Sequence, residues 1–271
     1  MSASLPVVLS VTSGKGGVGK TNLSINLALC LAGMGKRCVI LDADLGLANV
    51  DVLLGLTPER NLFHVFHEGV SLRDILHPTE HGFSILPASS GVSEMLSLST
   101  GQKLELLEAM DVLEDKLDFL IVDTGAGIND NVLYFNLAVQ ERLLVLTPEP
   151  TSLTDAYALV KVLKLRHEVD RFHVVVNMVK DEKGAKEIFA KLSNACDHFL
   201  TGVSLDFVGY VPLDGAVRQA VIQQKPFCSV TPAGDACRAV NRIAQKLTQW
   251  KPQDHLDGNI KFFWKKLLFA E

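Results

Sequence analysis

Residues 14–21 constrain the fold more than any other part of the chain. They spell Gly-Lys-Gly-Gly-Val-Gly-Lys-Thr, which matches the phosphate-binding pattern G-x-x-x-x-G-K-[ST] at every fixed position. Residues 7–12 before the pattern are apolar and β-branched and predict a buried strand. Residues 22–34 after it carry leucines at helical spacing. A glycine-rich turn between a strand and a helix is the context that this pattern requires, so the sequence predicts a phosphate-binding loop.

Each position of this loop has a role in the predicted site. Glycines let backbone N–H groups point inward around phosphate oxygens, in conformations that a side chain would block. The N-terminus of the next helix adds the positive end of its dipole. The Lys20 amine would reach the β- and γ-phosphates, and the Thr21 hydroxyl would bind Mg²⁺. The predicted nucleotide-binding residues here are Gly14, Lys15, Gly16, Gly17, Val18, Gly19, Lys20, Thr21 and Asn22.

Lys15 is the unusual residue of the loop, because an ordinary phosphate loop needs no lysine directly after its first glycine. The spelling Lys-Gly-Gly-Val-Gly-Lys-Thr resembles the deviant P-loop ATPases, the family that contains MinD, ParA and the nitrogenase iron protein. The resemblance implies that two subunits sandwich two ATP molecules. It also implies that Lys15 reaches into the nucleotide of the partner, which adds Lys15 to Lys20 as a catalytic residue.

Composition limits the classes of protein that fit. The chain has 271 residues, of which 48% are hydrophobic, and a mean hydropathy of +0.22, as expected of one well-packed α/β domain. A net charge of −5 gives no global attraction to nucleic acid, so we expect no sequence-specific nucleic-acid binding, although a local basic patch stays open. Five cysteines without a C-x-x-C pair predict free thiols in a reducing cytoplasm. We expect neither an N-terminal signal nor a membrane span.

Apolar runs alternate with helical patterns as far as residue 250. The pattern predicts an α/β fold in which helices flank both faces of a mostly parallel sheet. Strands are predicted at 7–12, 38–42, 83–87, 119–123, 143–147, 173–177 and 207–211, and helices at 22–34, 101–116, 153–166, 185–199 and 235–250. The predicted organisation is an ATPase domain over 1–250, a linker over 251–258 and a C-terminal amphipathic helix over 259–271.

Two carboxylates follow the second predicted strand, at the edge of the sheet where ligands bind. Phosphoryl transfer needs a group that orients the attacking water. By the family resemblance, Asp44 matches the water-orienting aspartate of switch I and is assigned to the metal site as well, whereas Asp42 supports the loop. An aspartate that caps the following turn is the alternative for Asp44.

The fourth predicted strand ends in Leu-Ile-Val-Asp, which is the Walker B arrangement. Asp123 would hold Mg²⁺ through Thr21 or through a water. Residues 124–127 then suit a loop that senses the γ-phosphate. Many relatives carry proline where this chain has Gly125, and we expect that difference to loosen the loop without removing a ligand.

Three residues near the ends of later strands match adenine contacts of the family. They are Asn177, whose side-chain amide can pair with the edge of the base, and Pro212 and Asp214, whose backbone could contact it. An asparagine that only ends a strand is the alternative for Asn177. Residues 148–152 and Asp155 follow the fifth predicted strand and are expected to line a dimer face, where Asp155 could tether Lys15.

The C-terminal segment has an amphipathic pattern. Its apolar stripe follows helical spacing and consists of Ile260, Phe263, Trp264, Leu267 and Leu268. Lysines lie off the stripe, as in an interfacial membrane helix, but two phenylalanines fall among them. A helix docked on its own domain or on a partner is the alternative. The eight histidines predict no metal site.

Longer stretches at 42–56, 123–127, 149–158 and 258–263 resemble one branch of the family, the flagellar-number regulators FlhG and FleN. The resemblance implies a cytoplasmic ATPase that forms a homodimer with ATP and Mg²⁺ and lies reversibly at the inner face of the cell membrane or the cell pole. The partners that it implies are a FleQ-like flagellar master transcription activator, the flagellar GTPase FlhF and C-ring proteins. They rest on resemblance alone.

Other functions of the family are weighed against this one. An iron–sulfur carrier would need paired cysteines near the switch loops, and none of the five lies between Cys38 and Cys196. A DNA-partitioning ParA would favour a basic face, and a tyrosine autokinase would need a terminal tyrosine cluster. A MinD-type division-site ATPase is the strongest alternative, because it shares the ATPase and a membrane tail. The residues around Asp44 and Asp155 favour the flagellar branch.

Overall fold

A mixed eight-stranded sheet forms the centre of the protein in a computed structural model, which describes residues 5–44, 49–87, 117–250 and 265. The strand order is β3-β4-β2-β5-β1-β6-β7-β8. All neighbours are parallel except β3 and β4. The strands are β1 Val7–Ser13, β2 Cys38–Ala43, β3 His77–Pro78, β4 Ser84–Pro87, β5 Phe119–Ala126, β6 Glu141–Leu146, β7 Arg171–Val179 and β8 Ser204–Pro212.

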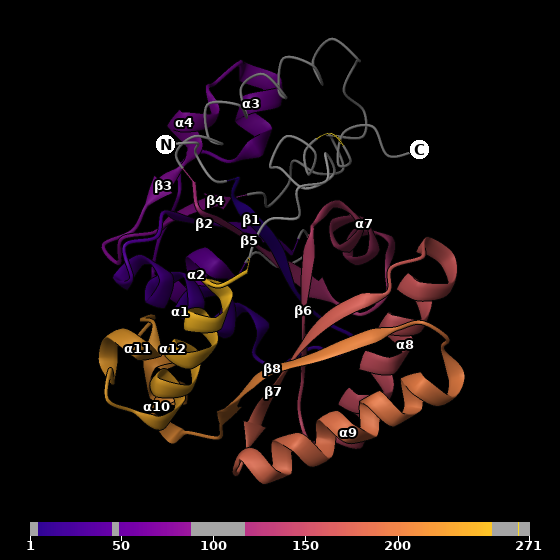
Figure 1. Cartoon of the computed structure of the whole chain (residues 1–271). Helices are drawn as coiled ribbons and strands as arrows, with labels where there is room; N and C mark the ends of the chain where they lie inside the picture. Colours follow the sequence, from indigo (N-terminus) through magenta and orange to yellow (C-terminus); the bar gives the residue numbers. More distant parts are fainter. Residues whose placement is uncertain (1–4, 45–48, 88–116, 251–264, 266–271) are drawn as a thin grey trace.

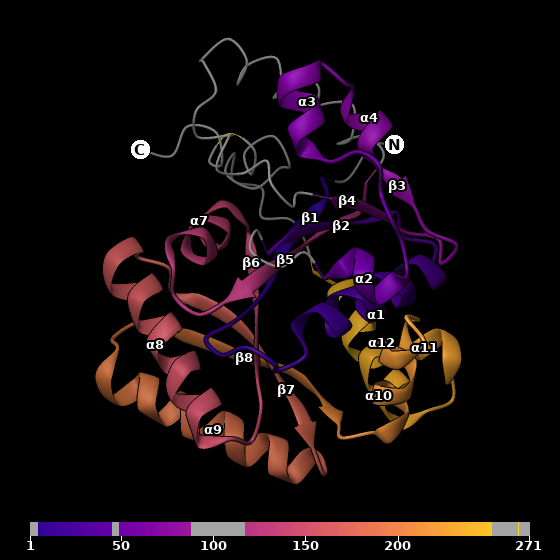
Figure 2. The same ribbon diagram turned by 180° about the vertical axis from the view of Figure 1, so that it is seen from behind.

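Helices cover both faces of the sheet (Figures 1 and 2). They are α1 Lys20–Gly33, α2 Val50–Leu54, α3 Leu62–Glu68, α4 Leu72–Ile75, α7 Asp130–Ala138, α8 Pro150–His167, α9 Glu182–Phe199, α10 Gly215–Ile222, α11 Phe227–Val230 and α12 Asp235–Leu247. Side chains of β1 alternate between the two layers. Leu9 and Val11 pack in the core formed with α1 and α12, and Val8 packs in the core formed with α7. Every residue of β1 is buried, as expected for a central parallel strand.

The predicted α/β fold and mostly parallel sheet are confirmed. Each of the seven predicted strands overlaps a strand of the sheet, and the helices predicted at 22–34, 153–166, 185–199 and 235–250 correspond to α1, α8, α9 and α12. The helix predicted at 101–116, the linker at 251–258 and nearly all of the terminal helix at 259–271 lie outside the described residues. No helix in the described part of the chain is long and apolar enough to span a bilayer.

The short elements were not predicted, because each is too short or too uniformly buried to show a period. In α7, Val132, Leu133 and Phe135 are all buried, so no polar face marks the helix. Its one local signal is Asn129, whose side-chain oxygen accepts a hydrogen bond from the backbone N–H of Val132.

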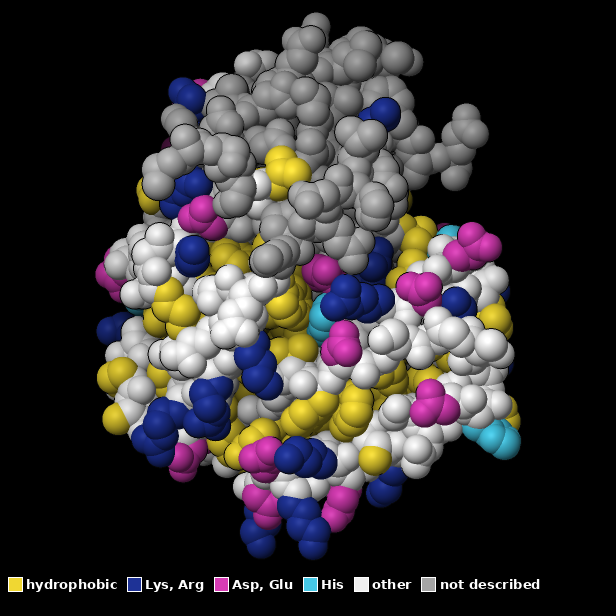
Figure 3. All heavy atoms as spheres, viewed as in Figure 1, with side chains coloured by type: hydrophobic (Ala, Val, Ile, Leu, Met, Phe, Trp, Pro, Cys, Tyr) yellow, Lys and Arg dark blue, Asp and Glu magenta, His cyan; other side chains and the backbone are white. Residues whose placement is uncertain are grey.

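The edge strand β8 is flanked by α9 and α12. Figure 3, in the same view as Figure 1, shows apolar side chains gathered over this part of the surface with lysine and arginine side chains beside them. The Lys246 amine donates a hydrogen bond to the carbonyl oxygen of Val208 in the strand. A lysine on an exposed edge discourages pairing with another strand, so this contact helps to keep the sheet at eight strands.

Candidate nucleotide site

The loop at residues 14–19 is packed too closely for side chains at two of its glycines. A Cβ atom at Gly14 would lie 2.0 Å from the carbonyl oxygen of Asp155 in α8. A Cβ atom at Gly19 would lie 2.5 Å from Nδ2 of Asn177. Gly17 and Gly19 have φ angles of 77° and 89°, in the left-handed region that glycine adopts without strain. The loop is therefore fixed between β7 and α8, with Gly19 as the N-cap of α1.

Lys20 is buried at the start of α1, and its Nζ donates a hydrogen bond to Ser13 Oγ at 2.9 Å. Ser13 Oγ in turn donates to the carbonyl oxygen of Lys15 at 2.7 Å. Burial lowers the pKa of Lys20, while the nearby carboxylates of Asp123 and Asp44 raise it. The structure thus brings the Lys20 ammonium and the carboxylates of Asp123 and Asp44 together at the carboxyl end of β1. A bound phosphate would need a positive charge and a metal ion there.

Asp123 is a fully buried carboxylate that faces the start of α1. Ser24 Oγ donates a hydrogen bond to its Oδ1 at 2.8 Å, and the Thr21 hydroxyl also bonds to it. Burial raises the pKa of Asp123 to about 6. The hydrogen bonds from Thr21 and Ser24 and the charge of Lys20 lower this pKa, but burial has the larger effect. A hydroxyl beside a carboxylate is a donor set of hard oxygens, which Mg²⁺ prefers, so the residues present fit this ion.

Asp42 lies directly beside Asp123, because the two residues are register partners on β2 and β5. Its carboxylate accepts hydrogen bonds from the backbone N–H groups of Asp44, Asn49 and Val50 at 3.2, 3.0 and 3.1 Å. Burial and the Asp123 charge raise the pKa of Asp42 to about 7. These contacts agree with the expectation that Asp42 supports the loop, since they hold both ends of the segment between β2 and α2.

Asp44 lies between the phosphate loop and the turn after β5. Its Oδ1 is 3.4 Å from the position that a Cβ atom on Gly125 would take, and its charge acts on both Lys20 and Asp123. The residues that follow it, 45–48, lie outside the described part of the chain. The structure therefore brings Asp44 to the predicted site, while its role in orienting water stays a prediction.

Lys15 points toward the N-terminus of α8. Its Nζ forms an ion pair with Glu149 and donates a hydrogen bond to Thr151 Oγ1 at 2.9 Å. The expectation that Asp155 tethers Lys15 is wrong in this structure. Asp155 lies one turn further along α8, where its carbonyl oxygen packs against Gly14 and its side chain is not the partner of the lysine.

A largely apolar cavity of about 270 Å³ opens beside the loop. It brings together all three predicted adenine contacts, Asn177, Pro212 and Asp214, with Gly19 and Asn22 at one end. Its other walls come from β8, α10, α11 and α12, through Val211, Val217, Phe227 and Val240 among others. A pocket with apolar walls and a few polar groups next to a phosphate loop suits a purine base.

Two of these polar side chains already have protein partners. Asn177 Nδ2 donates to the carbonyl oxygen of Val18 at 2.7 Å, and its Oδ1 accepts from the N–H of Met178 at 2.9 Å. Asp214 caps α10 by accepting from the N–H of Ala216 at 2.9 Å. Asn177 therefore fixes the phosphate loop to β7. The sequence predicted an adenine contact at this residue or, as the alternative, an asparagine that only ends a strand, and it did not predict this structural role.

Sequence reasoning missed the polar residues that position the charged ones. Ser13 and Ser24 each contact a lysine or aspartate of the site. Thr151, which contacts Lys15, was predicted only as part of a dimer face. Ser24 carries a signal in hindsight: it is a polar residue four positions after Lys20 on the buried side of a leucine-rich helix. Glu149 was predicted only as part of a dimer face.

Comparisons with known proteins show the family of this chain. The family model described as ParA, NUBPL iron-transfer P-loop NTPase, matches residues 5–248. The chain belongs to the ParA family of P-loop NTPases. Members of this family hydrolyse a nucleoside triphosphate. The roles of the glycine loop, the buried Lys20 and the Thr21–Asp123 pair in nucleotide binding stay predictions.

Two curated relatives are similar to this ParA-family protein over nearly its whole length. The antiactivator FleN of Pseudomonas aeruginosa is 48% identical over 261 residues, which are 96% of this chain and 93% of the relative. The flagellum site-determining protein YlxH of Helicobacter pylori is 30% identical over 263 residues, which are 96% of this chain and 89% of the relative.

Solved structures of ParA-family proteins share the fold. The cell division ATPase MinD of Pyrococcus furiosus superposes with a TM-score of 0.72 at 24% identity, over 90% of this chain and 99% of that one. MinD of Pyrococcus horikoshii in complex with Mg-ADP gives a TM-score of 0.70 at 23% identity, over 90% of this chain and 97% of that one. At this level of identity the likeness concerns the fold alone.

Proposed function

We propose that this protein is a slow, Mg²⁺-dependent ATPase that dimerises with ATP and, in that state, restrains the number of flagella. The observation that carries the proposal is the 48% identity to the antiactivator FleN over 96% of the chain, together with the similarity to the flagellum site-determining protein YlxH. An identity of that extent covers the loop, both switch segments and the helices around them. The site also supports the proposal, because Asp123 and Lys20 suit Mg²⁺ and phosphate and the apolar pocket beside them suits a purine base.

Each group of residues in the site would have a different role in phosphoryl transfer. Loop amides and Lys20 would bind the β- and γ-phosphates, and Thr21 with Asp123 would hold Mg²⁺, which supplies charge neutralisation when bound. Asp44 would orient the attacking water and also belongs to the metal site. The adenine would lie in the pocket against Asn177, Pro212 and Asp214. Lys15 would leave Glu149 and act on the nucleotide of a second copy.

The ATP dimer is the proposed signalling state, because a switch needs partners that bind one state better than the other. A FleQ-like master activator, the flagellar GTPase FlhF or C-ring proteins would dock on surface created by the dimer. The segment 259–271 would bind the inner face of the membrane reversibly, more strongly as a pair of tails in the dimer than alone. The protein would then be cytoplasmic in one state and peripheral to the membrane in the other.

Two variants test the enzymatic part of the proposal. Lys20→Ala should abolish nucleotide binding, because it removes the buried cation of the loop, and Asp44→Ala should keep binding but lose turnover. Nucleotide titration and phosphate release measure the two properties. Lys161→Ala, on the exposed side of α8, is the matched control and should behave as wild type. Full turnover in Asp44→Ala would remove Asp44 from the water-orienting role.

Deletion of the gene in its own host tests the biological role. Extra flagella per cell, counted by electron microscopy and corrected by wild type but not by Lys20→Ala, would support the proposal. Normal flagellation with misplaced septa would instead favour the MinD-type division-site alternative, and defective plasmid or chromosome segregation would favour the ParA-type one.

A further inference from the structure

Three of the five cysteines meet in the core behind the nucleotide pocket. Cys30 comes from α1, Cys228 from α11 and Cys237 from α12, three helices that pack against one another (Figures 1 and 2). Their sulfur atoms all lie within 4.8 Å of one another, and the Cys30 and Cys228 sulfurs are 3.9 Å apart. Cys38 and Cys196 are also buried and free but lie outside this trithiol cluster.

We propose that the trithiol cluster is a binding site for a soft metal ion in three-coordinate geometry, and that Cu(I) is the ion it takes. Thiolates select soft ions of this kind over Mg²⁺ or Ca²⁺. Two sulfurs about 2.3 Å from one ion and 120° apart are about 4 Å from each other, by the metal–thiolate distance found in proteins. The 3.9 Å between Cys30 and Cys228 fits this geometry without a shift of either helix.

The number of available ligands favours Cu(I) over Zn²⁺ at this site. A structural zinc site has four protein ligands, but no fourth His, Cys, Asp or Glu of the described residues joins the cluster. Most of the surrounding side chains belong to the apolar core between α1, α12 and the sheet, which includes Leu27, Val240 and Ala244. A polar neighbour among the described residues is Asn26, whose side-chain oxygen accepts a hydrogen bond from the N–H of Cys228. A water as fourth ligand would be costly there, whereas a trigonal ion needs none.

The charge of the complex can be kept low. Each thiol that becomes a thiolate ligand releases its proton to solvent as the metal–sulfur bond forms. Two thiolates and one neutral thiol around Cu(I) leave a single net negative charge.

The position of Cys228 gives an ion a route to the cluster and the cluster a link to the nucleotide. Its helix α11 has four residues, and Ser229 and Val230 beside it are exposed, so opening of this short segment would admit the ion. Phe227 on the same helix lines the nucleotide pocket. A bound ion would join α1, α11 and α12 and stiffen that wall of the pocket.

Titration of the reduced full-length protein with Cu(I), in competition with a chromogenic Cu(I) chelator, tests the proposal. We expect one copper per chain, three sulfur neighbours by X-ray absorption, and a rise in Tm on loading. Cys228→Ala and Cys237→Ala should each weaken copper binding by more than about 100-fold. Mutation of residues that only hydrogen-bond to a metal-binding side chain already lowers metal affinity by about 10–100-fold, and loss of the metal-binding side chain itself costs more. Cys38→Ala and Cys196→Ala are the matched controls and should bind copper as wild type does.

Nucleotide binding by the apo forms of Cys228→Ala and Cys237→Ala checks that they are folded, so that a loss of copper binding is a loss of ligand. Unchanged copper affinity in these variants, or no copper retained against the chelator by wild type, would overturn the proposal. Zn²⁺ that binds at the cluster and displaces Cu(I) would overturn the three-coordinate assignment.

Discussion

At the scale of single residues, the neighbouring carboxylates of Asp42 and Asp123 set the electrostatics of the site. They are register partners on adjacent parallel strands, and both are buried. Burial raises the pKa of Asp42 to about 7 and that of Asp123 to about 6, from 3.8 in each case. The pair therefore takes up a proton as the pH falls through neutrality, and Asp42 takes it more readily than Asp123 does.

This pair predicts the pH dependence of stability. Between about pH 4 and pH 7 the folded protein binds protons that the unfolded chain has already lost, so the free energy of unfolding falls as pH rises through this window. We expect the nucleotide-free protein to be less stable at pH 8 than at pH 5 by on the order of 2 kcal/mol, or roughly 4–8 °C in Tm. Thermal unfolding across this range measures the slope.

Asp123→Asn should flatten that slope, because it removes one titrating group and the charge that raises the pKa of the other. Asp130→Asn, at the exposed start of α7, is the matched control and should keep the wild-type slope. A Tm that rises from pH 5 to pH 8 in the nucleotide-free protein would contradict the assignment of these two carboxylates.

The Lys15–Glu149 ion pair predicts an effect on dimerisation. It holds within one chain the lysine that would act on the nucleotide of a second copy, so it competes with the dimer. The pair is partly exposed, and such pairs contribute up to about 1 kcal/mol. The dimer would release one such pair in each of its two subunits, so Glu149→Gln should tighten the ATP-dependent dimer by up to about 2 kcal/mol, or roughly 30-fold. Analytical ultracentrifugation with a slowly hydrolysed ATP analogue measures this effect.

The control for this experiment is Glu187→Gln, an exposed carboxylate on α9 that should leave the dimer unchanged. Weaker dimerisation of Glu149→Gln would show that Glu149 acts across the interface in the dimer rather than against it.

The positions of Lys20, Thr21, Asp44 and Asp123 could be predicted because strand order along the chain and the parallel arrangement bring strand ends to one edge of the sheet. The partner of Lys15 could not, because Glu149 and Asp155 lie on the same helix one to two turns apart. Which of them a long lysine reaches depends on how close the loop lies to α8, and that distance is a property of the packed structure.

At the scale of elements, the contact between the loop and α8 predicts a strong effect of Gly14→Ala. The new Cβ would lie 2.0 Å from a backbone oxygen, so α8 or the loop would have to move. We expect destabilisation of about 1–3 kcal/mol, the range for overpacking a tight site, together with weaker nucleotide binding. Thermal unfolding and nucleotide titration measure the two effects.

Gly33→Ala is the matched control, because nothing lies within 4 Å of the added carbon at the end of α1. It should be neutral or stabilising by up to about 1 kcal/mol. Equal Tm values for the two variants would mean that α8 yields easily at Gly14.

Long elements with clear periodicity were predictable from the sequence, and short ones were not. The seven predicted strands are all present, since short apolar runs rich in β-branched residues favour a strand over a buried helix. The helices α10 and α11 were missed, although they form a wall of the nucleotide pocket, because eight and four residues carry too little pattern. The sequence therefore predicted three of the residues that line the candidate adenine pocket, but not the helices α10 and α11 that form part of its walls.

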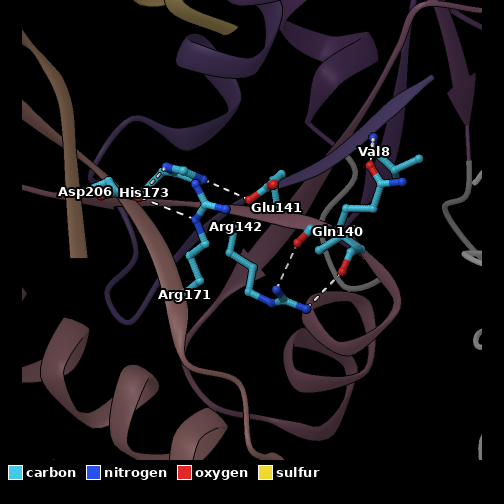
Figure 4. Close-up of polar contacts among 8 residues, drawn as sticks. Val8, Gln140, Glu141, Arg142, Arg171, His173 and Asp206 are labelled. Atoms are coloured by element: carbon cyan, nitrogen blue, oxygen red, sulfur yellow. Dashed lines mark hydrogen bonds and ion pairs between the residues drawn. The ribbon is translucent and has the colours of Figure 1, made fainter. Parts of the chain in front are cut away.

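At the scale of the whole molecule, the end of the predicted ATPase domain is fixed to the sheet. The Trp250 ring packs on His173 with centroids 4.0 Å apart. His173 Nε2 lies 2.8 Å from Glu141 Oε2, and its Nδ1 lies 3.5 Å from Asp206 Oδ2, so strands β6, β7 and β8 all contribute to this contact (Figure 4). The predicted boundary at residue 250 thus falls directly after a residue that packs on the domain.

This contact predicts different outcomes for truncations only two residues apart. A chain that ends at residue 250 should keep the Tm and nucleotide binding of the full protein, while losing any binding to liposomes that residues 259–271 provide. A chain that ends at residue 248 also loses the Trp250 ring. It should unfold about 2–8 °C lower, since loss of a partly buried aromatic contact of about 1–2 kcal/mol lowers Tm by about 2–4 °C per kcal/mol in a domain of this size.

Trp250→Ala in the full-length chain separates the ring from the chain end, and should lower Tm as much as the shorter truncation does. His173→Phe, which keeps a ring for stacking but loses its bonds to Glu141 and Asp206, should fall between wild type and Trp250→Ala. If the chain that ends at residue 250 were already destabilised, the segment after it would have to pack on the domain. The docked-helix alternative would then replace the independent membrane tail.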